Sequence, residues 1–335
     1  MKKLSIFFIG LLLIPTLLLT SCDRGDDLNP TNPIERAPAF ELMKDYMVEN
    51  NLDINNILTN TDNEKFVVGA PAEADLAAFL DKYYIMDIRQ NPDFLAAHIE
   101  GANNVAFSDI LTTASSVTKP ILVVCYTGQT ACYATALLRL YGYSHTRALK
   151  WGMSGWNEST AGPWNSKIGN IAANSPNWNY QGAPSNIPYT DPVISTTLTT
   201  GEEILKERVE AVVAAGFKGV EGSAVLNNPG GYFINNYFSE GDYTGFGHIN
   251  TAYRIQPFIL ADDSYKSLDP NANTVVVYCY TGQTSAVLSA TLNVLGYNAA
   301  SLKFGMNGLY NSNPAWTTNQ WLGDSNPKDL PIFTN

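Results

Sequence analysis

The sequence predicts an α/β protein made of two similar units, each a mostly parallel β-sheet with helices on both faces. The six residues Cys-Tyr-Thr-Gly-Gln-Thr occur at 125–130 and again 154 positions later, at 279–284. Each copy follows a short β-branched run and precedes a helix-like segment that ends in Gly-Tyr, at residues 142–143 and 296–297. Strands that alternate with helical stretches indicate βαβ units, so the repeat predicts two parallel sheets.

The first unit shows this alternation from its beginning. Phe40–Asn50 is typical of a short amphipathic helix, and Glu73–Lys82 of a second one, with apolar residues at helical spacing. Tyr83–Ile88 is predicted to be a buried strand, and Val105–Ile110 continues the unit beyond it. Ile121–Val124 is the β-branched strand that enters the first hexapeptide.

The pattern restarts in the second unit, with a helix from Glu202 to Ala215, a strand near Tyr232–Asn235 and the strand Val275–Tyr278. Residues 155–197 are rich in Asn, Ser, Pro, Gly and Trp, which indicates an interdomain connection. Because this stretch contains three tryptophans, we expect it to pack on a domain.

The N-terminus is typical of a targeting segment. Lys2 and Lys3 precede the apolar run 4–19, and Leu19-Thr20-Ser21-Cys22 resembles a bacterial lipobox. We therefore expect lipidation of Cys22 and an exported lipoprotein of the cell envelope, on the periplasmic face or the outer membrane. The alternatives are an ordinary secretory peptide with a chance cysteine, and a membrane span, for which the run is short.

Together these patterns predict the following domain boundaries. Residues 1–21 form the signal peptide, 22–38 a tether, 39–160 the first domain, 161–199 the interdomain connection, 200–312 the second domain and 313–335 a C-terminal tail.

Charge argues against nucleic acid as a partner. The formal net charge is −11, and it becomes −13 when Lys2 and Lys3 are removed with the signal peptide. An acidic chain without a Lys/Arg cluster is a poor match for phosphates or for anionic lipid. The only membrane contact we expect is the N-terminal lipid anchor.

Cysteine usage predicts a reactive thiol. With Cys22 lipidated, Cys125, Cys132 and Cys279 remain, an odd number in an exported protein. This is no disulfide framework, and the absence of CxxC spacing and the presence of only three histidines disfavour zinc. We expect no metal and no cofactor.

The hexapeptide places its cysteine where a thiolate is stabilised. A loop that enters a helix N-terminus directs backbone N–H groups inward, at the positive end of the helix dipole. We therefore expect Cys125 and Cys279 to lose their protons easily and to act as nucleophiles.

These motifs resemble the rhodanese family, the sulfurtransferases, in a tandem arrangement. The family's active loop is six residues opened by the catalytic Cys, commonly with Gly at the fourth place. The resemblance covers roughly residues 65–160 and 200–312 and includes Asp87-Ile88-Arg89, the segment His98 to Ala102 and Trp151-Gly152-Met153. It implies catalytic roles for Cys125 and Cys279. It also implies a persulfide cradle formed by Tyr126, Thr127, Gly128, Gln129 and Thr130 and by Tyr280, Thr281, Gly282, Gln283 and Thr284.

The resemblance implies transfer of sulfane sulfur from thiosulfate, polysulfide or a persulfide to a thiol or cyanide acceptor, through a cysteine persulfide. Family members that favour thiosulfate commonly carry basic residues directly after the Cys. Tyr126-Thr127 and Tyr280-Thr281 are uncharged here. We therefore expect weak use of thiosulfate.

Several residues have expected supporting roles. Gly128 and Gly282 should adopt a positive φ, the loop tyrosines should rim the pocket, and Thr130 and Thr284 should cap the following helices. Asp87 and Arg89 are expected to form a structural ion pair. Alignment of the two repeats places Asn235 and Tyr237 at the same positions in the second half.

His98 and His248 are expected to be structural hydrogen-bond partners rather than general bases. Cys132 could resolve a Cys125 intermediate, but the second repeat has Ala286 at its position, so we expect a small, apolar, inward-facing site.

Two other functions are compatible with a cysteine at the start of such a loop. A related Cys-loop phosphatase needs an Arg that clamps the phosphoryl group, and the corresponding places are Ala131 and Ser285. The other rival is a non-catalytic module that binds sulfur or docks a partner on the envelope. Both repeats keep the cysteine, which favours the enzyme.

Overall fold

The computed structural model describes residues 38–316 and 318–334. The predicted signal peptide, the lipobox with Cys22 and nearly all of the tether lie outside the described residues. Among the residues described, none of the helices has both the length and the apolar character needed to cross a lipid bilayer.

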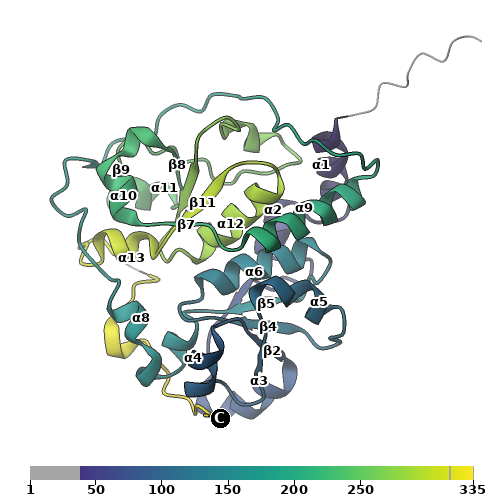
Figure 1. The fold of residues 1–335 in the computed structure, drawn as a ribbon. Helices are drawn as coiled ribbons and strands as arrows, with labels where there is room; N and C mark the ends of the chain where they lie inside the picture. The colour runs from purple at the N-terminus through teal and green to yellow at the C-terminus, as the bar shows by residue number, and fades with distance from the viewer. Residues whose placement is uncertain (1–37, 317, 335) are drawn as a thin grey trace, which may run out of the picture. The chain divides into compact units, whose positions relative to one another are not determined.

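The first half is built on a five-stranded parallel sheet (Figure 1). Its strands lie in the order β1 (Val67–Val68), β5 (Arg147–Leu149), β4 (Ile121–Val124), β2 (Tyr84–Asp87) and β3 (Asn103–Asn104). All four neighbouring pairs are parallel. The predicted strand at residues 121–124 is confirmed residue for residue, and the one at 83–88 within a residue at each end.

The helices of the first half follow in chain order, and the first of them packs on α9 (Gly201–Ala215) of the second half (Figure 1). They are α1 (Ala39–Glu49), α2 (Ile54–Leu58), α3 (Leu76–Lys82), α4 (Asn91–Ala96), α5 (Ile110–Ala114), α6 (Gln129–Leu140), α7 (Met153–Trp156) and α8 (Gly162–Asn165). The segment that continues from Val105 forms the 3-10 turn Phe107–Asp109 and then enters α5.

The second half repeats the plan with four parallel strands. Their order is β7 (Gly219–Val220), β11 (Ala299–Leu302), β10 (Val275–Tyr278) and β8 (Phe233–Asn236). Its helices are α9 (Gly201–Ala215), α10 (Gly222–Asn227), α11 (Glu240–Gly245), α12 (Gln283–Val294) and α13 (Gly305–Tyr310). A small antiparallel pair joins β6 (Trp178–Asn179) to β9 (His248–Ile249).

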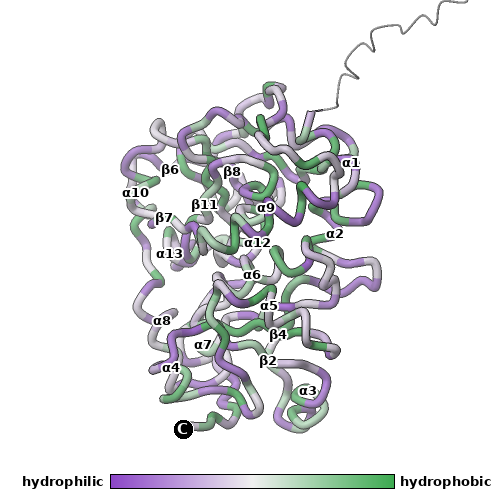
Figure 2. The backbone as a smooth tube through the Cα atoms, turned by 45° about the vertical axis from the view of Figure 1, so that its right-hand side comes forward, coloured by the Kyte–Doolittle hydropathy of each residue, from purple (hydrophilic) through white to green (hydrophobic). Residues whose placement is uncertain are grey.

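The central strands β4 and β10 are buried along their whole length. Because alternate side chains of a strand point to opposite sides, each of these strands contributes to two cores. Along β4, Ile121 and Val123 enter a central core, whereas Leu122 and Val124 enter an outer one. The hydrophobic colour of β4 is visible in Figure 2. The central core also contains Val275 and Val277 of β10 and continues across both halves, where α6 packs on α12. The predicted α/β class with helices on both faces is confirmed.

The tryptophan-rich segments pack on the domains, as expected. Trp156 and Trp164 of the connection and Trp321 of the tail are all almost completely buried. The tail returns to the first half, where the Trp156 indole N–H donates to the Pro331 carbonyl over 2.8 Å. Phe333 completes an antiparallel bridge with His98. The C-terminal residues therefore belong to the packing of the first half.

Candidate functional site

Both hexapeptides occupy the same place in their halves, between the carboxyl end of the central strand and the start of a helix. Gly128 and Gly282 precede α6 and α12 and adopt φ values of 83° and 78°, as predicted. The helices begin at Gln129 and Gln283, and neither has a side-chain cap. The predicted capping role of Thr130 and Thr284 is therefore wrong, because each threonine already lies inside the first turn.

The Cys125 sulfur accepts hydrogen bonds from two main-chain amides. The N–H groups of Gly128 and Ala131 donate to Cys125 Sγ over 3.1 and 3.3 Å. The residue is only 3% exposed. This is the amide cradle that the strand–loop–helix order predicted.

The pKa of this thiol differs from the expectation. Burial raises the pKa of the Cys125 thiol above its ordinary value, the amides of Ala131, Thr127 and Gly128 act in the opposite direction, and the charge of Asp87 raises it further. Desolvation of the charged form outweighs three amide contacts. The expectation of an easily ionised resting thiol at Cys125 is therefore wrong.

The second cradle has a different composition. The Ser285 N–H donates to Cys279 Sγ over 3.3 Å, and the Ser285 hydroxyl lies 3.6 Å from the same sulfur. Cys279 is 1% exposed. Ser285 occupies the helix position that Ala131 holds in the first half.

In each half a second loop hydrogen-bonds to the carbonyl of the cysteine. The Met153 N–H donates to the Cys125 carbonyl over 2.9 Å, and the Met306 N–H donates to the Cys279 carbonyl over 3.0 Å. Gly152 makes this approach possible, since a Cβ there would lie 2.7 Å from the amide nitrogens of both Thr127 and Gly128. Gly305 is its counterpart, and its Cβ would collide with the Cys279 carbonyl.

A second repeat in the sequence is the signal for this support. Lys150-Trp-Gly-Met in the first half returns as Lys303-Phe-Gly-Met in the second.

Asp87 and Arg89 form the predicted structural ion pair. Arg89 Nη2 lies 2.7 Å from Asp87 Oδ2, with both side chains almost fully buried. The same nitrogen donates to the Ala97 carbonyl over 2.6 Å. The guanidinium also lies 5.7 Å from the centre of the Tyr126 ring, so the pair positions the loop from the neighbouring strand.

The predicted internal counterparts of this pair are wrong by one residue. Asp87 pairs in register with Val124, the residue before Cys125, and Asn236 pairs with Tyr278, the residue before Cys279. The counterparts are therefore Asn236 and Phe238, not Asn235 and Tyr237. Phe238 N–H donates to Asn236 Oδ1 over 2.8 Å, as Arg89 N–H does to Asp87 Oδ1 over 3.0 Å.

The loop tyrosines are anchored by carboxylates. Tyr126 donates to Asp93 over 2.5 Å and Tyr280 donates to Asp242 over 2.6 Å. Burial and these carboxylates raise the pKa of both phenols to about 12. Both tyrosines therefore remain neutral and fixed.

The histidines have the predicted structural roles. His98 Nδ1 lies 2.9 Å from the Phe94 carbonyl, and His248 Nδ1 lies 3.1 Å from the Tyr243 carbonyl. Each ring also stacks on the aromatic ring of the same partner residue. Burial lowers the pKa of His248.

Cys132 lies in the central core and is completely buried, as is Ala286 in the second half. Burial raises the pKa of Cys132 well above its ordinary value. This agrees with a small, inward-facing packing position.

Each cysteine loop is hydrogen-bonded to the opposite half, a contact that the sequence motifs do not predict. Gln129 Oε1 accepts from the Phe304 N–H over 2.8 Å, and Gln283 Nε2 donates to the Thr127 carbonyl over 3.1 Å. Each glutamine lies against the glycine of the opposite loop. The identity of Gln in both copies was the available signal.

A pocket of about 400 Å³ opens beside the first loop, at the junction of the two halves. Its lining residues are Tyr126, Thr127, Gln129 and Thr130 from the loop, Pro163, Ser166 and Lys167 from the connection, and Phe217, Glu221, Lys303 and Phe304 from the second half. Tyr126 therefore rims the pocket, as predicted, whereas Tyr280 is not among its lining residues.

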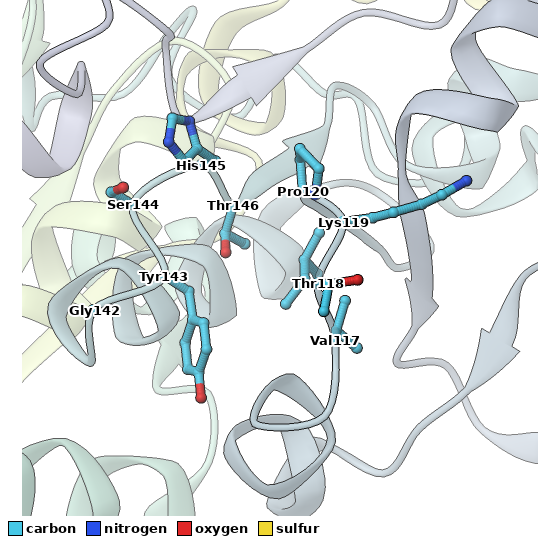
Figure 3. A pocket seen from close by; sticks show the side chains of 10 residues that line it. Val117, Thr118, Lys119, Pro120, Gly142, Tyr143, Ser144, His145 and Thr146 are labelled. Carbon is cyan, nitrogen blue, oxygen red and sulfur yellow. The ribbon is translucent and has the colours of Figure 1, made fainter.

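Another cavity, of about 290 Å³, lies at the opposite end of the first sheet (Figure 3). Pro120 precedes β4 and Thr146 precedes β5, so both lie at the amino ends of their strands. Because Cys125 follows the carboxyl end of β4, this cavity is separate from the cysteine loops.

Comparison with known proteins agrees with this arrangement. The profile of the Rhodanese-like domain matches residues 72–159 and 238–312. The chain is 35% identical over 75 residues to the thiosulfate sulfurtransferase GlpE of Pseudomonas fluorescens (strain SBW25), a match that covers 22% of this chain and 68% of that relative.

Two solved structures are also similar. A thiosulfate sulfurtransferase from Pseudomonas aeruginosa aligns with 84% of this chain and 49% of its own at 15% identity and a TM-score of 0.28. A 3-mercaptopyruvate sulfurtransferase from Leishmania major aligns with 74% of each chain at 12% identity and a TM-score of 0.27. From the sequence matches and the duplicated cysteine loops, the chain belongs to the rhodanese family of sulfurtransferases and carries two rhodanese-like domains.

Proposed function

We propose that this protein moves sulfane sulfur from a small donor to a thiophilic acceptor, through persulfides on Cys125 and Cys279. The observation that carries the proposal is the pair of main-chain amides, from Gly128 and Ala131 at the start of α6, that donate to Cys125 Sγ. Oriented amides in a site of low water content stabilise an anion without reorganisation.

The reaction proceeds in two displacements. The cysteine thiolate attacks the outer sulfur of a persulfide or polysulfide donor, the S–S bond of the donor breaks, and the donor leaves as a thiolate. The cysteine then carries a terminal sulfur anion, which the loop amides hold. A thiol or cyanide acceptor attacks this terminal sulfur and releases the cysteine thiolate, which completes a ping-pong cycle.

The uncharged loop positions favour polysulfide or a persulfide carrier as donor over thiosulfate. Tyr126 and Tyr280 are neutral and tied to carboxylates, so the residue after each cysteine offers no cation for a dianion. The test is the ratio of kcat/KM for polysulfide to that for thiosulfate. A ratio well below one would contradict this donor preference while leaving sulfur transfer in place.

Persulfide trapping tests the function itself. The Cys125→Ser and Cys279→Ser variants are treated separately with polysulfide, and the intact mass is measured without reductant. We expect a gain of one sulfur in each single variant and none in the double variant. Cys132→Ser is the matched control and should gain sulfur on both Cys125 and Cys279.

The same experiment separates the enzyme from its rival. A non-catalytic module that binds sulfur or docks a partner would gain no covalent sulfur, or would gain it and fail to pass it to cyanide or a thiol. Either result would replace the enzymatic proposal with the docking one.

We also propose that the chain is an exported lipoprotein, lipidated at Cys22. The support is the charged start, the apolar run and the sequence Leu19-Thr20-Ser21-Cys22. Incorporation of labelled palmitate should require Cys22, and the Cys22→Ser variant should leave the membrane fraction. Equal labelling of the wild-type and variant proteins would contradict the proposal.

A further inference from the structure

The second cysteine cradle contains a chain of buried hydroxyl groups. Cys279 Sγ lies 3.6 Å from Ser285 Oγ, which lies 2.8 Å from Ser301 Oγ. Ser301 Oγ in turn donates to the Gly282 carbonyl over 3.3 Å. Both serines are completely buried. The chain therefore runs from the reacting sulfur back to the loop that holds it.

The first half has no equivalent of this chain. Ala131 stands at the place of Ser285 on the helix. Ser301 pairs in register with Val277, as Ala148 pairs with Val123, so Ala148 stands at the place of Ser301. Both alanines are completely buried as well. At these two places the cradles therefore differ by two hydroxyl groups.

While the Cys279 thiol is neutral, the direction of these hydrogen bonds follows from the number of hydrogens that each hydroxyl can donate. A serine hydroxyl has one hydrogen and two acceptor lone pairs. Ser301 uses its hydrogen on the Gly282 carbonyl, so Ser285 donates to Ser301. Ser285 Oγ is then left as an acceptor for the Cys279 thiol.

We propose that Ser285 is a catalytic residue that reverses its hydrogen bond when the Cys279 sulfur becomes an anion, and that Ser301 is the positioning residue that permits the reversal. When the sulfur is deprotonated or carries a terminal sulfur, the Ser285 hydroxyl rotates and donates to it. Ser301 then donates to Ser285 Oγ and releases the Gly282 carbonyl. Each serine keeps its own hydrogen, so the step involves rotation and no proton transfer between them.

After the reversal, the Ser285 hydroxyl donates to the sulfur of the second cradle, and it does so only while that sulfur is an anion. A fixed donor would stabilise the anion but leave no acceptor for the neutral thiol in a fully buried site. A hydroxyl group serves both states, because it is donor and acceptor. This inference rests on the proposed sulfur chemistry at Cys279, which it extends by naming the groups that distinguish the two domains.

Among the described residues, titratable side chains approach Cys279 from its own loop and from α6. Tyr278 precedes it and Tyr280 follows it, and burial raises the pKa of both phenols. Cys132 approaches from α6, and burial raises its pKa well above the ordinary value. Asp242 accepts the Tyr280 hydroxyl and lies beyond that ring. A shift in the reactivity of Cys279 can therefore be read as an effect on its own sulfur.

The experiment measures alkylation of Cys279 by iodoacetamide as a function of pH, in a Cys125→Ser/Cys132→Ser background. Ser285→Ala should move the pH midpoint upward by about one unit, because a hydrogen bond to the charged form is lost. Ser301→Ala should move it in the same direction by less. Ser289→Ala is the matched control, since this buried serine of α12 bonds to the Ala286 carbonyl, and its midpoint should not move.

The reciprocal variant keeps the proposal testable if Ser285→Ala does not fold. Ala131→Ser/Ala148→Ser transfers the hydroxyl chain to the first half, in a background in which Cys125 is the only remaining cysteine of the two loops. Its alkylation midpoint should move downward. An unchanged midpoint in folded Ser285→Ala, or an unchanged midpoint in the folded transfer variant, would overturn the proposal.

Alkylation does not depend on sulfur transfer, so the two proposals fail separately. A shifted midpoint in a protein that never gains sulfur would support the serine chain and contradict the sulfurtransferase function. A persulfide on Cys279 together with an unchanged midpoint would support the sulfurtransferase function and contradict the role of the serine chain.

Discussion

Gln129 and Gln283 stand at the same place in the two cysteine loops, and each one hydrogen-bonds to the main chain of the opposite half. The two bonds are not equivalent. The Thr127 carbonyl accepts a hydrogen bond from Gln283 Nε2. It also accepts one from the Trp164 indole N–H over 3.1 Å. Gln129, in contrast, accepts from the N–H of Phe304, a residue with a φ of 62°.

We therefore expect Gln129→Ala to cost more stability than Gln283→Ala. Removing Gln129 takes the acceptor from the Phe304 N–H and should cost about 1–3 kcal/mol, whereas the Thr127 carbonyl keeps a donor when Gln283 is removed, for a loss of about 1 kcal/mol. Urea unfolding measures both. The exposed Gln181→Ala serves as control, and equal losses in the two loops would contradict the asymmetry.

The buried pair of Asp87 and Arg89 gives a second prediction. Asp87→Asn leaves the Arg89 charge buried without its carboxylate and should cost about 3–5 kcal/mol. The second half shows how the same place is built without charge, with Asn236 and Phe238. Asp87→Asn/Arg89→Phe should therefore recover part of the loss, and the double-mutant cycle measured by urea unfolding should show a clear coupling energy. Additive losses would refute this interpretation.

Gly152 and Gly305 give a third prediction, which concerns each half separately. Gly152 has a φ of 61° and a ψ of −152°, a region that is essentially restricted to glycine. Gly152→Ala should destabilise the protein by about 3 kcal/mol, from backbone strain and from the clash with the loop amides. It should abolish persulfide formation on Cys125 and spare Cys279, with the opposite result for Gly305→Ala.

Intact-mass measurement after polysulfide treatment reads out this pattern. Gly69→Ala is the control, because a Cβ at Gly69 would meet no atom within 4 Å. Loss of sulfur from both cysteines in one glycine variant would show that the two cradles do not act separately.

The pH dependence of Cys125 gives a fourth prediction. Because burial raises the pKa of this thiol, the thiolate fraction at neutral pH is smaller in the folded protein than in the unfolded chain. Alkylation of Cys125, in a Cys132→Ser/Cys279→Ser background, should rise with pH and reach its midpoint at a higher pH than in urea. A midpoint below that of the unfolded chain would show that the amides outweigh burial.

Much of the fold was predictable because the same strand–loop–helix pattern occurs in both halves of the sequence. The strands at 121–124 and 275–278 carry unbroken buried side chains, so their pattern survives in both copies. The positive φ of Gly128 and Gly282 was predictable for a similar reason, since a tight loop requires it. The ion pair of Asp87 and Arg89 followed from its place on the strand next to the loop.

What the sequence did not reveal depends on contacts between distant residues. The one-residue error at Asn235 arose because a strand's register is set by its neighbours, and two successive asparagines look alike in sequence. The capping role given to Thr130 failed because the helix begins one residue earlier, directly after Gly128. The thiol pKa depends on the depth of burial, which a local motif does not determine.

The contact of the tail with the first half has a consequence for how the polypeptide is made. The Trp156 indole bonds to a carbonyl that lies 175 residues later in the chain. At the usual 5–20 residues per second, the ribosome needs roughly 10 to 35 s to travel that distance. Throughout that interval the nascent first half lacks Phe333, which bridges to His98, so it reaches its finished form only after the second half has been translated.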